Sequence, residues 1–170
     1  MIISGIHIGF DFDDTAIVQL QDEVVTGVTR IPGHNASDSM EAILALSNRA
    51  DLTVIDASGQ GLQVFRRLRR TLPHKKIAGV GFTGSKLTSS GDFIWCTPKA
   101  ALLRDLRNQL RDGHITIDCL HQDGDALEYE VEQFQRRHAT RPGILNSTVC
   151  ALALSCFART TMRDLALDPA

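Results

Sequence analysis

The fold is decided by residues 52–61, LTVIDASGQG. Residues 52–56 form a short apolar run that is typical of a strand buried on both faces. Asp56 closes this run, and the serine and glycines that follow it predict a turn. Apolar residues then recur at helical spacing from Leu62 to Leu72, which predicts a helix. The segment therefore predicts a buried strand, a turn and a helix, with an aspartate at the carboxyl end of the strand.

The chain before this segment begins with three predicted strands. Residues 6–11 alternate between apolar and polar and end at Asp11, and residues 15–20 and 23–29 are rich in β-forming residues. Residues 21–22 are all that separates the last two runs, which indicates a tight hairpin. We therefore expect three consecutive antiparallel strands at the start of the chain.

The rest of the chain alternates between helical and strand-like patterns. The expected elements are a helix near 40–47, strands at 76–82 and 115–119, a short edge strand at 92–96, and helices at 98–112, 126–137 and 147–159. Thr97 is expected to cap the helix that begins at Pro98. Hairpin strands followed by such alternation imply an α/β fold, a mixed sheet with antiparallel strands first and parallel strands after them, flanked by helices. We expect one domain over residues 1–160 and a C-terminal tail over 161–170.

The composition is that of an ordinary globular protein. The 170 residues are 43% hydrophobic, and a net charge of −2 provides no global attraction to nucleic acid or anionic membranes. The sequence contains no apolar run long enough to span a membrane and no signal peptide at its amino terminus. Four cysteines, at positions 96, 119, 150 and 156, form no C-x-x-C pair. We expect them to be reduced core residues in a cytosolic protein, and we expect no zinc site.

Residues 79–86, GVGFTGSK, follow a predicted strand and partly match a phosphate-binding P-loop. That motif requires glycine, then lysine, then serine or threonine. Here Ser85 precedes Lys86 and Leu87 follows it. Nucleotide binding is therefore not expected.

Two acidic positions are candidates for a metal site. Asp11, which opens the run Asp11-Phe12-Asp13-Asp14, and Asp56 each end a predicted strand, where an unpaired carboxylate is unfavourable unless something compensates it. Mg²⁺ is one such compensation, because it prefers carboxylate oxygens and retained water. Neighbouring strands lie ~4.8 Å apart, so the two carboxylates would be able to share a cation. The alternative is structural, with a turn at the first acids and a helix cap at Asp56.

Basic residues gather on the helix that follows Asp56. The cluster contains Arg66, Arg67, Arg69 and Arg70, with Lys75 and Lys76 after it. This pattern indicates either a solvated helix face or a patch that contacts phosphates, whose binding weakens steeply with salt. As DNA-contacting candidates we name Arg66, Arg67, Arg70, Lys75 and Lys76.

Several of these segments, taken together, resemble a known family. They are Asp11 with residues 15–18 (TAIV), residues 54–61 (VIDASGQG), Pro98-Lys99 at a helix start, and residues 149–154 (VCALAL). Their order and spacing resemble the nuclease domain of phage large terminases, over about residues 5–159. The resemblance implies an RNase H-like fold and cleavage of concatemeric DNA during packaging, with two divalent metal ions.

The resemblance also implies roles for individual acids. Asp11 matches the acid on the family's first strand, and Asp56 matches the acid after its fourth strand. Both would be catalytic metal ligands for Mg²⁺ or Mn²⁺. Asp13 or Asp14 would match a further acid that precedes the TAI segment.

The sequence departs from the family pattern before the last helix. The family has His-Asp-Asp there, whereas this chain has Leu145-Asn146-Ser147. Asn146 would offer the metal a neutral oxygen in place of a carboxylate, so we expect weak binding of the second metal ion and attenuated cleavage. Substitute acids would be Asp125, Glu128 or Glu130, if the fold brings that helix near.

Three functions remain open from sequence. The first is an attenuated two-metal DNA endonuclease, and the second is an inactive DNA-binding or assembly module that keeps the fold. The third is an unrelated small-molecule enzyme on a mixed sheet, because fold alone does not determine function. The first two imply double-stranded DNA as partner, with a terminase ATPase motor, small subunit or portal as candidate protein partners. They also imply a phage or prophage protein in the cytoplasm of a bacterial host, either a free-standing protein or a domain of a longer one, since no ATPase motif is present.

Overall fold

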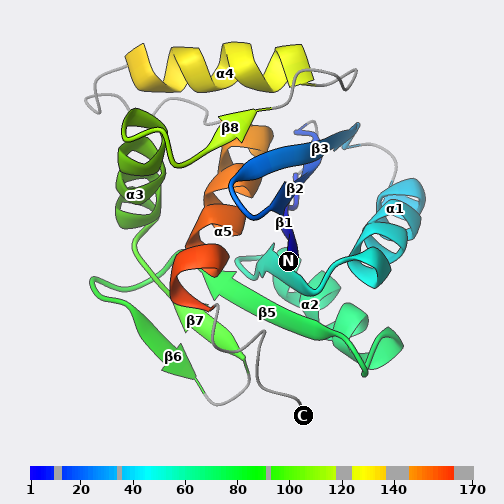
Figure 1. Ribbon diagram of the computed structural model, residues 1–170. Helices are drawn as coiled ribbons and strands as arrows, with labels where there is room; N and C mark the ends of the chain where they lie inside the picture. Colours follow the sequence, from blue (N-terminus) through cyan, green and yellow to red (C-terminus); the bar gives the residue numbers. More distant parts are fainter. Residues whose placement is uncertain (10–12, 34–35, 91–92, 118–123, 137–145, 163–170) are drawn as a thin grey trace.

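The computed structural model describes residues 1–9, 13–33, 36–90, 93–117, 124–136 and 146–162. Within these residues, eight strands form one mixed sheet in the order β6-β7-β5-β4-β1-β2-β3-β8 (Figure 1). The strands are β1 (Ile2–His7), β2 (Thr15–Gln21), β3 (Val24–Ile31), β4 (Leu52–Asp56), β5 (Lys76–Gly81), β6 (Thr88–Ser90), β7 (Ile94–Cys96) and β8 (Thr116–Ile117). The helices are α1 (Ala36–Arg49), α2 (Gly61–Thr71), α3 (Lys99–Arg111), α4 (Gly124–Arg136) and α5 (Ser147–Thr161).

The first three strands are antiparallel, as their spacing predicts. β1 pairs with β2 and β2 with β3, and the tight turn between β2 and β3 contains Asp22 at a φ of 56°. β4 then pairs with β1 in parallel, and β5 pairs with β4 in parallel. The predicted mixed sheet, antiparallel first and parallel afterwards, is therefore confirmed.

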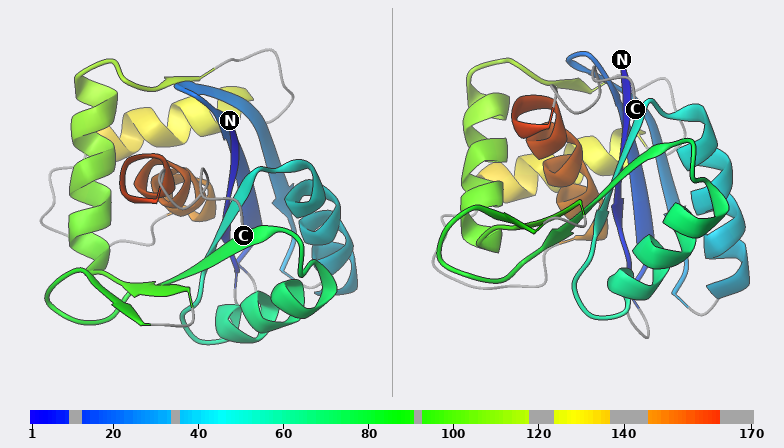
Figure 2. Two further views of the ribbon diagram at one scale, coloured as in Figure 1. Left: turned by 60° about the horizontal axis from the view of Figure 1, so that its bottom comes forward. Right: turned by 90° about the horizontal axis from the view of Figure 1, so that it is seen from below.

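The helices cover the two faces of the sheet separately. Figure 2 shows α1 and α2 on one side of the strands and α3, α4 and α5 on the other. Each face has its own apolar core, because side chains alternate between faces along a strand. Phe65 and Leu68 of α2 pack with Ile6 and Ile55 on one face, whereas α5 packs on the other.

Helix α5 is the most buried helix of the described chain, as its apolar sequence predicts. Residues 148–158 are all buried, and the helix lies against β1 and β2. Gly5 of β1 permits this close approach, since an added Cβ would lie 2.2 Å from the backbone oxygen of Ala151. Ser155 extends the contact by donating its hydroxyl to the carbonyl of Val18, at 3.0 Å.

Three local predictions are wrong. The first strand ends at His7 instead of continuing to Asp11. Its register with β2 stops at the pair His7–Ala16, and the backbone N–H of Gly9 donates to Thr15 Oγ1 at 3.3 Å, so the chain already turns toward β2 there. The alternation that predicted a longer strand therefore belongs partly to the connection between β1 and β2.

The other two errors lie near β7. β6 was not predicted, and it places β7 inside the sheet instead of at its edge. Residues after β5 thus lead into a strand, whereas a P-loop leads into a helix. Pro98, not Thr97, occupies the N-cap position of α3, and that position forms no side-chain capping hydrogen bond.

No helix within the described ranges is long and apolar enough to cross a membrane. The predicted tail falls mainly on residues 163–170, which lie outside the described part of the chain.

Candidate functional site

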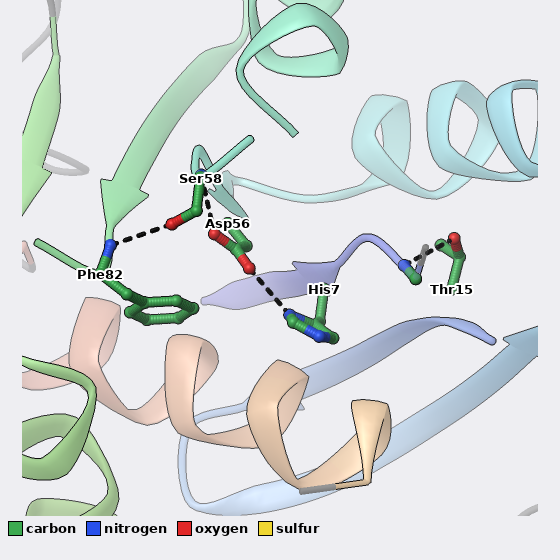
Figure 3. A network of polar contacts seen from close by, with 6 residues as sticks. His7, Thr15, Asp56, Ser58 and Phe82 are labelled. Atoms are coloured by element: carbon green, nitrogen blue, oxygen red, sulfur yellow. Dashed lines mark hydrogen bonds and ion pairs between the residues drawn. The ribbon is translucent and has the colours of Figure 1, made fainter. Parts of the chain in front are cut away.

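The predicted strand-end carboxylate, Asp56, is buried, and a nitrogen atom lies beside each of its oxygens. It is 3% exposed, at the last position of β4. Its Oδ1 accepts the backbone N–H of Ser58 at 2.8 Å, and its Oδ2 lies 2.9 Å from Nδ1 of His7 (Figure 3). Ser58 in turn accepts the backbone N–H of Phe82 at 3.0 Å, which ties the end of β4 to the end of β5. The carboxylate thus accepts one hydrogen bond and lies against an imidazole nitrogen on its other edge.

The turn after Asp56 needs glycine for a steric reason. An added Cβ at Gly61 would lie 1.8 Å from the backbone oxygen of Asp56, so only glycine lets α2 begin against the end of β4. The backbone N–H of Ser58 donates a hydrogen bond to the Asp56 side chain, a local turn that aspartate favours. The predicted helix cap is therefore replaced by a side-chain turn, because Gln60 is the N-cap residue of α2.

Strand register explains why His7 is the partner of Asp56. β1 and β4 pair up to Ile6 and Ile55, so His7 and Asp56 are the next residues along the two strands. His7 also pairs with Ala16 of β2, which pairs with Arg30 of β3. Residues opposite one another on neighbouring strands point to the same face. This row of side chains therefore faces α5.

The start of α5 lies close to this row. Ala151 and Ser155 of α5 face Gly5 of β1. Ser147, the first residue of α5, lies one helical turn before Ala151, toward the carboxyl end of β1. Cys150 is buried beside Lys99 and Asp56. Burial raises the pKa of its thiol, while the Lys99 ammonium opposes the rise, so this cysteine is an inert packing group.

A second polar group lies at the other end of the row. Arg30 contacts Glu130 Oε1 of α4 at 3.0 Å through Nη1 and Asp14 Oδ2 at 3.1 Å through Nη2. Burial raises the pKa of the Glu130 carboxyl, while Arg30 and the Asn146 side chain favour its charged form. The fold thus brings Glu130 to the start of α5, whereas Asp125 and Glu128 are exposed.

The other predicted site residues are distributed differently. Asp11 lies outside the described residues. Asp13 is exposed, and Asn146 is the exposed N-cap residue of α5 without a side-chain capping hydrogen bond. Sequence reasoning missed His7 and Arg30. Both residues pair with Ala16 of β2, so the strand register would have identified them. That register can be assigned only when the end of β1 is known.

The donor set does not fit a pair of divalent cations in the described part of the chain. No group of three or more His, Cys, Asp or Glu side chains is placed there to hold a metal ion. Asp56 already accepts a hydrogen bond at Oδ1, and its neighbour on β1 is an imidazole that lies against Oδ2. Two dications need several anionic ligands to offset their mutual repulsion. These residues instead form a paired polar site.

Three of the five basic residues that were predicted to contact DNA lie on α2, on the opposite face of the sheet. Arg66, Arg67 and Arg70 are exposed on α2, and none of the three forms an ion pair with a described residue. The Lys75 ammonium approaches the carbonyl of Ala50 at 3.5 Å, and Lys76 is half-buried. α2 leads back from the end of β4 to the start of β5, so its arginines lie toward the other end of the strands from Asp56.

A separate pocket of about 400 Å³ lies between α1, α2 and the ends of β1 and β2. Its lining includes Ile8, Thr15, Met40, Ile43, Gln63 and Val64. It contains neither Asp56 nor His7, and the described residues that line it carry no charge. It therefore offers no group for chemistry.

Comparisons with known proteins identify the fold. No protein-family model matches the sequence, and no curated protein matches it. Among solved structures, the nuclease domain of the large terminase subunit gp2 of bacterial virus Sf6 matches with a TM-score of 0.65 and 17% identity, over 91% of this chain and 87% of that chain. This is the fold of a phage terminase nuclease domain. The large terminase nuclease of thermophilic phage G20c, with bound magnesium, matches with a TM-score of 0.63 and 15% identity, over 92% and 80%.

The terminase-nuclease fold is shared more widely. The Holliday junction resolvase of fowlpox virus matches with a TM-score of 0.52 and 13% identity, over 97% of this chain and 99% of that chain. The predicted RNase H-like fold is therefore confirmed. At these identities the likeness establishes the fold, and the chemistry must be argued from this chain's own residues.

The buried Glu130 carboxyl predicts that the stability of the protein depends on pH. Glu130→Gln is expected to become more stable relative to the wild type as the pH rises from below the ordinary pKa of 4.5 through the raised native pKa. Below 4.5, Glu130 is neutral in both native and unfolded wild-type protein, so its raised pKa has its full stabilising effect; above the native pKa this effect is lost. Urea unfolding of both proteins across this range measures the difference, in which other titrations cancel. A difference that is constant with pH, or that falls, contradicts the expectation.

Proposed function

We propose that this chain is a nuclease-like domain of the phage terminase type that holds double-stranded DNA during genome packaging and cuts it weakly or not at all. It acts beside a terminase ATPase motor, with the small subunit or portal as further partners, in the cytoplasm of the bacterial host. The observation that carries the proposal is the pairing of Asp56 with His7 in a fold shared with terminase nucleases.

The chemistry of phosphodiester cleavage supports weak cutting. One cation must activate the attacking water, and a second must stabilise the leaving oxygen. In the described chain, Asp56 is bound by Ser58 and His7, and α5 starts with the neutral Asn146. The neighbour of Asp56 on β1 is an imidazole, where a second carboxylate would attract a dication.

The charge distribution on α2 supports DNA contact. Phe65 and Leu68 bury one side of the helix, so the side with Arg66, Arg67 and Arg70 faces solvent. Three guanidinium groups without a described carboxylate partner form a surface that suits phosphate oxygens. Such contacts position DNA and carry no sequence information. DNA held there lies on the face of the sheet opposite His7 and Asp56, which suits a holding role.

The test is DNA binding by a triple variant, Arg66→Gln, Arg67→Gln and Arg70→Gln. We expect weaker binding of a double-stranded oligonucleotide, because each phosphate contact releases counterions. The slope of log K against log salt should become shallower by roughly 0.9 for each arginine that contacts phosphate. Fluorescence anisotropy at several salt concentrations measures both the affinity and the slope.

A matched triple variant controls for net charge. Arg104, Arg111 and Arg136 lie on α3 and α4, on the other face of the sheet, and all are exposed. Changing these three to glutamine removes the same charge and should leave the salt slope nearly unchanged. Equal losses in the two triple variants, or wild-type protein that does not bind DNA at low salt, contradict the proposal.

A second candidate function is an attenuated metal-dependent endonuclease. The observation in its favour is Glu130, a buried carboxylate that the fold brings beside Asn146. Together with Asp56, it would supply an anionic ligand for Mg²⁺ or Mn²⁺ in place of the absent acid. Its engagement by Arg30 at 3.0 Å argues against this role, because the guanidinium already satisfies Oε1.

A further inference from the structure

We propose that the Asp56 site is metal-independent, because the His7 side chain occupies the position beside the buried carboxylate where a cation would be held. The proposal deepens the proposed function, on which it depends only for the terminase-type fold. Its test requires metal ions and no DNA. The two proposals can therefore fail separately.

The contacts of Asp56 carry the first step. A buried carboxylate needs hydrogen bonds or a cation to offset the loss of water. Asp56 is 3% exposed, and the Ser58 N–H and the His7 imidazole lie at 2.8 and 2.9 Å from its two oxygens. The Ser58 contact is a hydrogen bond, whereas the His7 contact is a close approach of Nδ1 to Oδ2 without a hydrogen bond. Each carboxylate oxygen thus has a nitrogen atom of the chain beside it.

The position of His7 carries the second step. Register places residue 7 beside Asp56 on the neighbouring strand, and both side chains face α5. Side chains that are adjacent across a strand pair are close enough to share a cation. The identity of residue 7 therefore decides what partner Asp56 has: an imidazole closes the pair, whereas a carboxylate would leave two like charges that only a cation could hold together.

The surroundings carry the third step. Lys99 lies near Cys150, which also lies near Asp56, so a positive charge is already present in this part of the molecule. Arg30 engages Asp14 and Glu130. One guanidinium thus contacts an oxygen of each of these two carboxylates, while Glu130 Oε2 is buried without a hydrogen-bond partner. The nitrogen atoms of His7 and Arg30 therefore occupy positions beside the described carboxylates where a cation would be held.

The experiment measures Mn²⁺ binding to the full chain and to the His7→Asp variant. Binding is detected by the shift in Tm on thermal unfolding and by the loss of the free Mn²⁺ signal in electron paramagnetic resonance. Wild-type protein should show no change in Tm between EDTA and Mn²⁺, and no bound ion. His7→Asp should bind Mn²⁺, and its Tm should rise by roughly 5 °C at concentrations well above Kd.

Two control variants separate the causes. His7→Asn removes the imidazole without adding a carboxylate, and it should not respond to Mn²⁺. Adding Asp56→Asn to His7→Asp should abolish the response, since one ligand is then lost. Circular dichroism confirms that each variant is folded.

Two outcomes overturn the proposal. One is a wild-type protein that binds Mn²⁺ and loses this binding on Asp56→Asn, because Asp56 would then be a metal ligand despite its contact with His7. The wild-type comparison decides this even if His7→Asp does not fold. The other is a folded His7→Asp variant that binds no Mn²⁺, because the identity of residue 7 would then not control the site.

Discussion

Gly5→Ala is expected to lower the free energy of unfolding by about 3 kcal/mol, at the upper end for overpacked sites. An added Cβ at Gly5 would lie 2.2 Å from the backbone oxygen of Ala151 and 2.3 Å from Ser155 Oγ. The first atom belongs to a buried helix and cannot rotate away. The second is held by its hydrogen bond to the carbonyl of Val18. The new methyl group can therefore be accommodated only if α5 moves away from β1.

Urea unfolding at one pH measures this loss, and Gly27→Ala is its matched control. Gly27 also lies in the sheet, in β3, but an added Cβ there meets only the flexible end of Gln19, at 2.9 Å. That end can move, so the control should change stability by less than about 1 kcal/mol. If the two variants differ by less than this, α5 does not pack on β1 as described.

The order of elements could be predicted because each depends on local patterns. The hairpin between β2 and β3 follows from two β-rich runs with a two-residue gap, and β4 follows from an apolar run that closes on Asp56. The buried helix α5 follows from a run of small and apolar residues. The terminase-nuclease fold then arises from their order, since hairpins followed by parallel strands permit few arrangements.

The composition of the site could be predicted only in part. Asp56 ends its strand where expected, and the neutral Asn146 stands at the start of α5. His7 was not predicted, because its role depends on where β1 ends and on the register between β1 and β4. These are long-range properties, and an alternation shifted by a few residues reads equally well from sequence. The same limit explains why Arg30 and Glu130 meet across a hundred positions of sequence without any local signal.

These positions share one physical property, which is that carboxylates at the strand ends lie against nitrogen atoms of the protein. Asp56 has His7, and Glu130 and Asp14 have Arg30. A two-metal site has the opposite arrangement, in which an excess of carboxylates is balanced by cations from solution. Activity should therefore depend on restoring that excess of negative charge.

The variant with the largest expected effect on activity is the double variant His7→Asp with Asn146→Asp. It should nick supercoiled plasmid with Mg²⁺ or Mn²⁺ at least about tenfold faster than wild-type protein, a change equivalent to about 1.4 kcal/mol in the activation barrier. The two new carboxylates would lie at the end of β1, beside Asp56, and at the N-cap of α5, beside Glu130. Wild-type protein should nick no faster than Asp56→Asn, because its polar site is already paired.

The wild-type arm of this assay distinguishes the two candidate functions. Metal-dependent nicking by wild-type protein that is lost in Asp56→Asn would favour the attenuated endonuclease over the holding module. Glu130→Gln and Asp11→Ala would then identify the remaining ligands, since one carboxylate lies beside Asn146 and the other was predicted from the resemblance. Loss of nicking on Glu130→Gln would mean that the buried carboxylate leaves Arg30 to bind metal. Background nicking by every single variant, with activity gained only in the double variant, would make the residues at positions 7 and 146 together the reason that the wild-type protein does not cut.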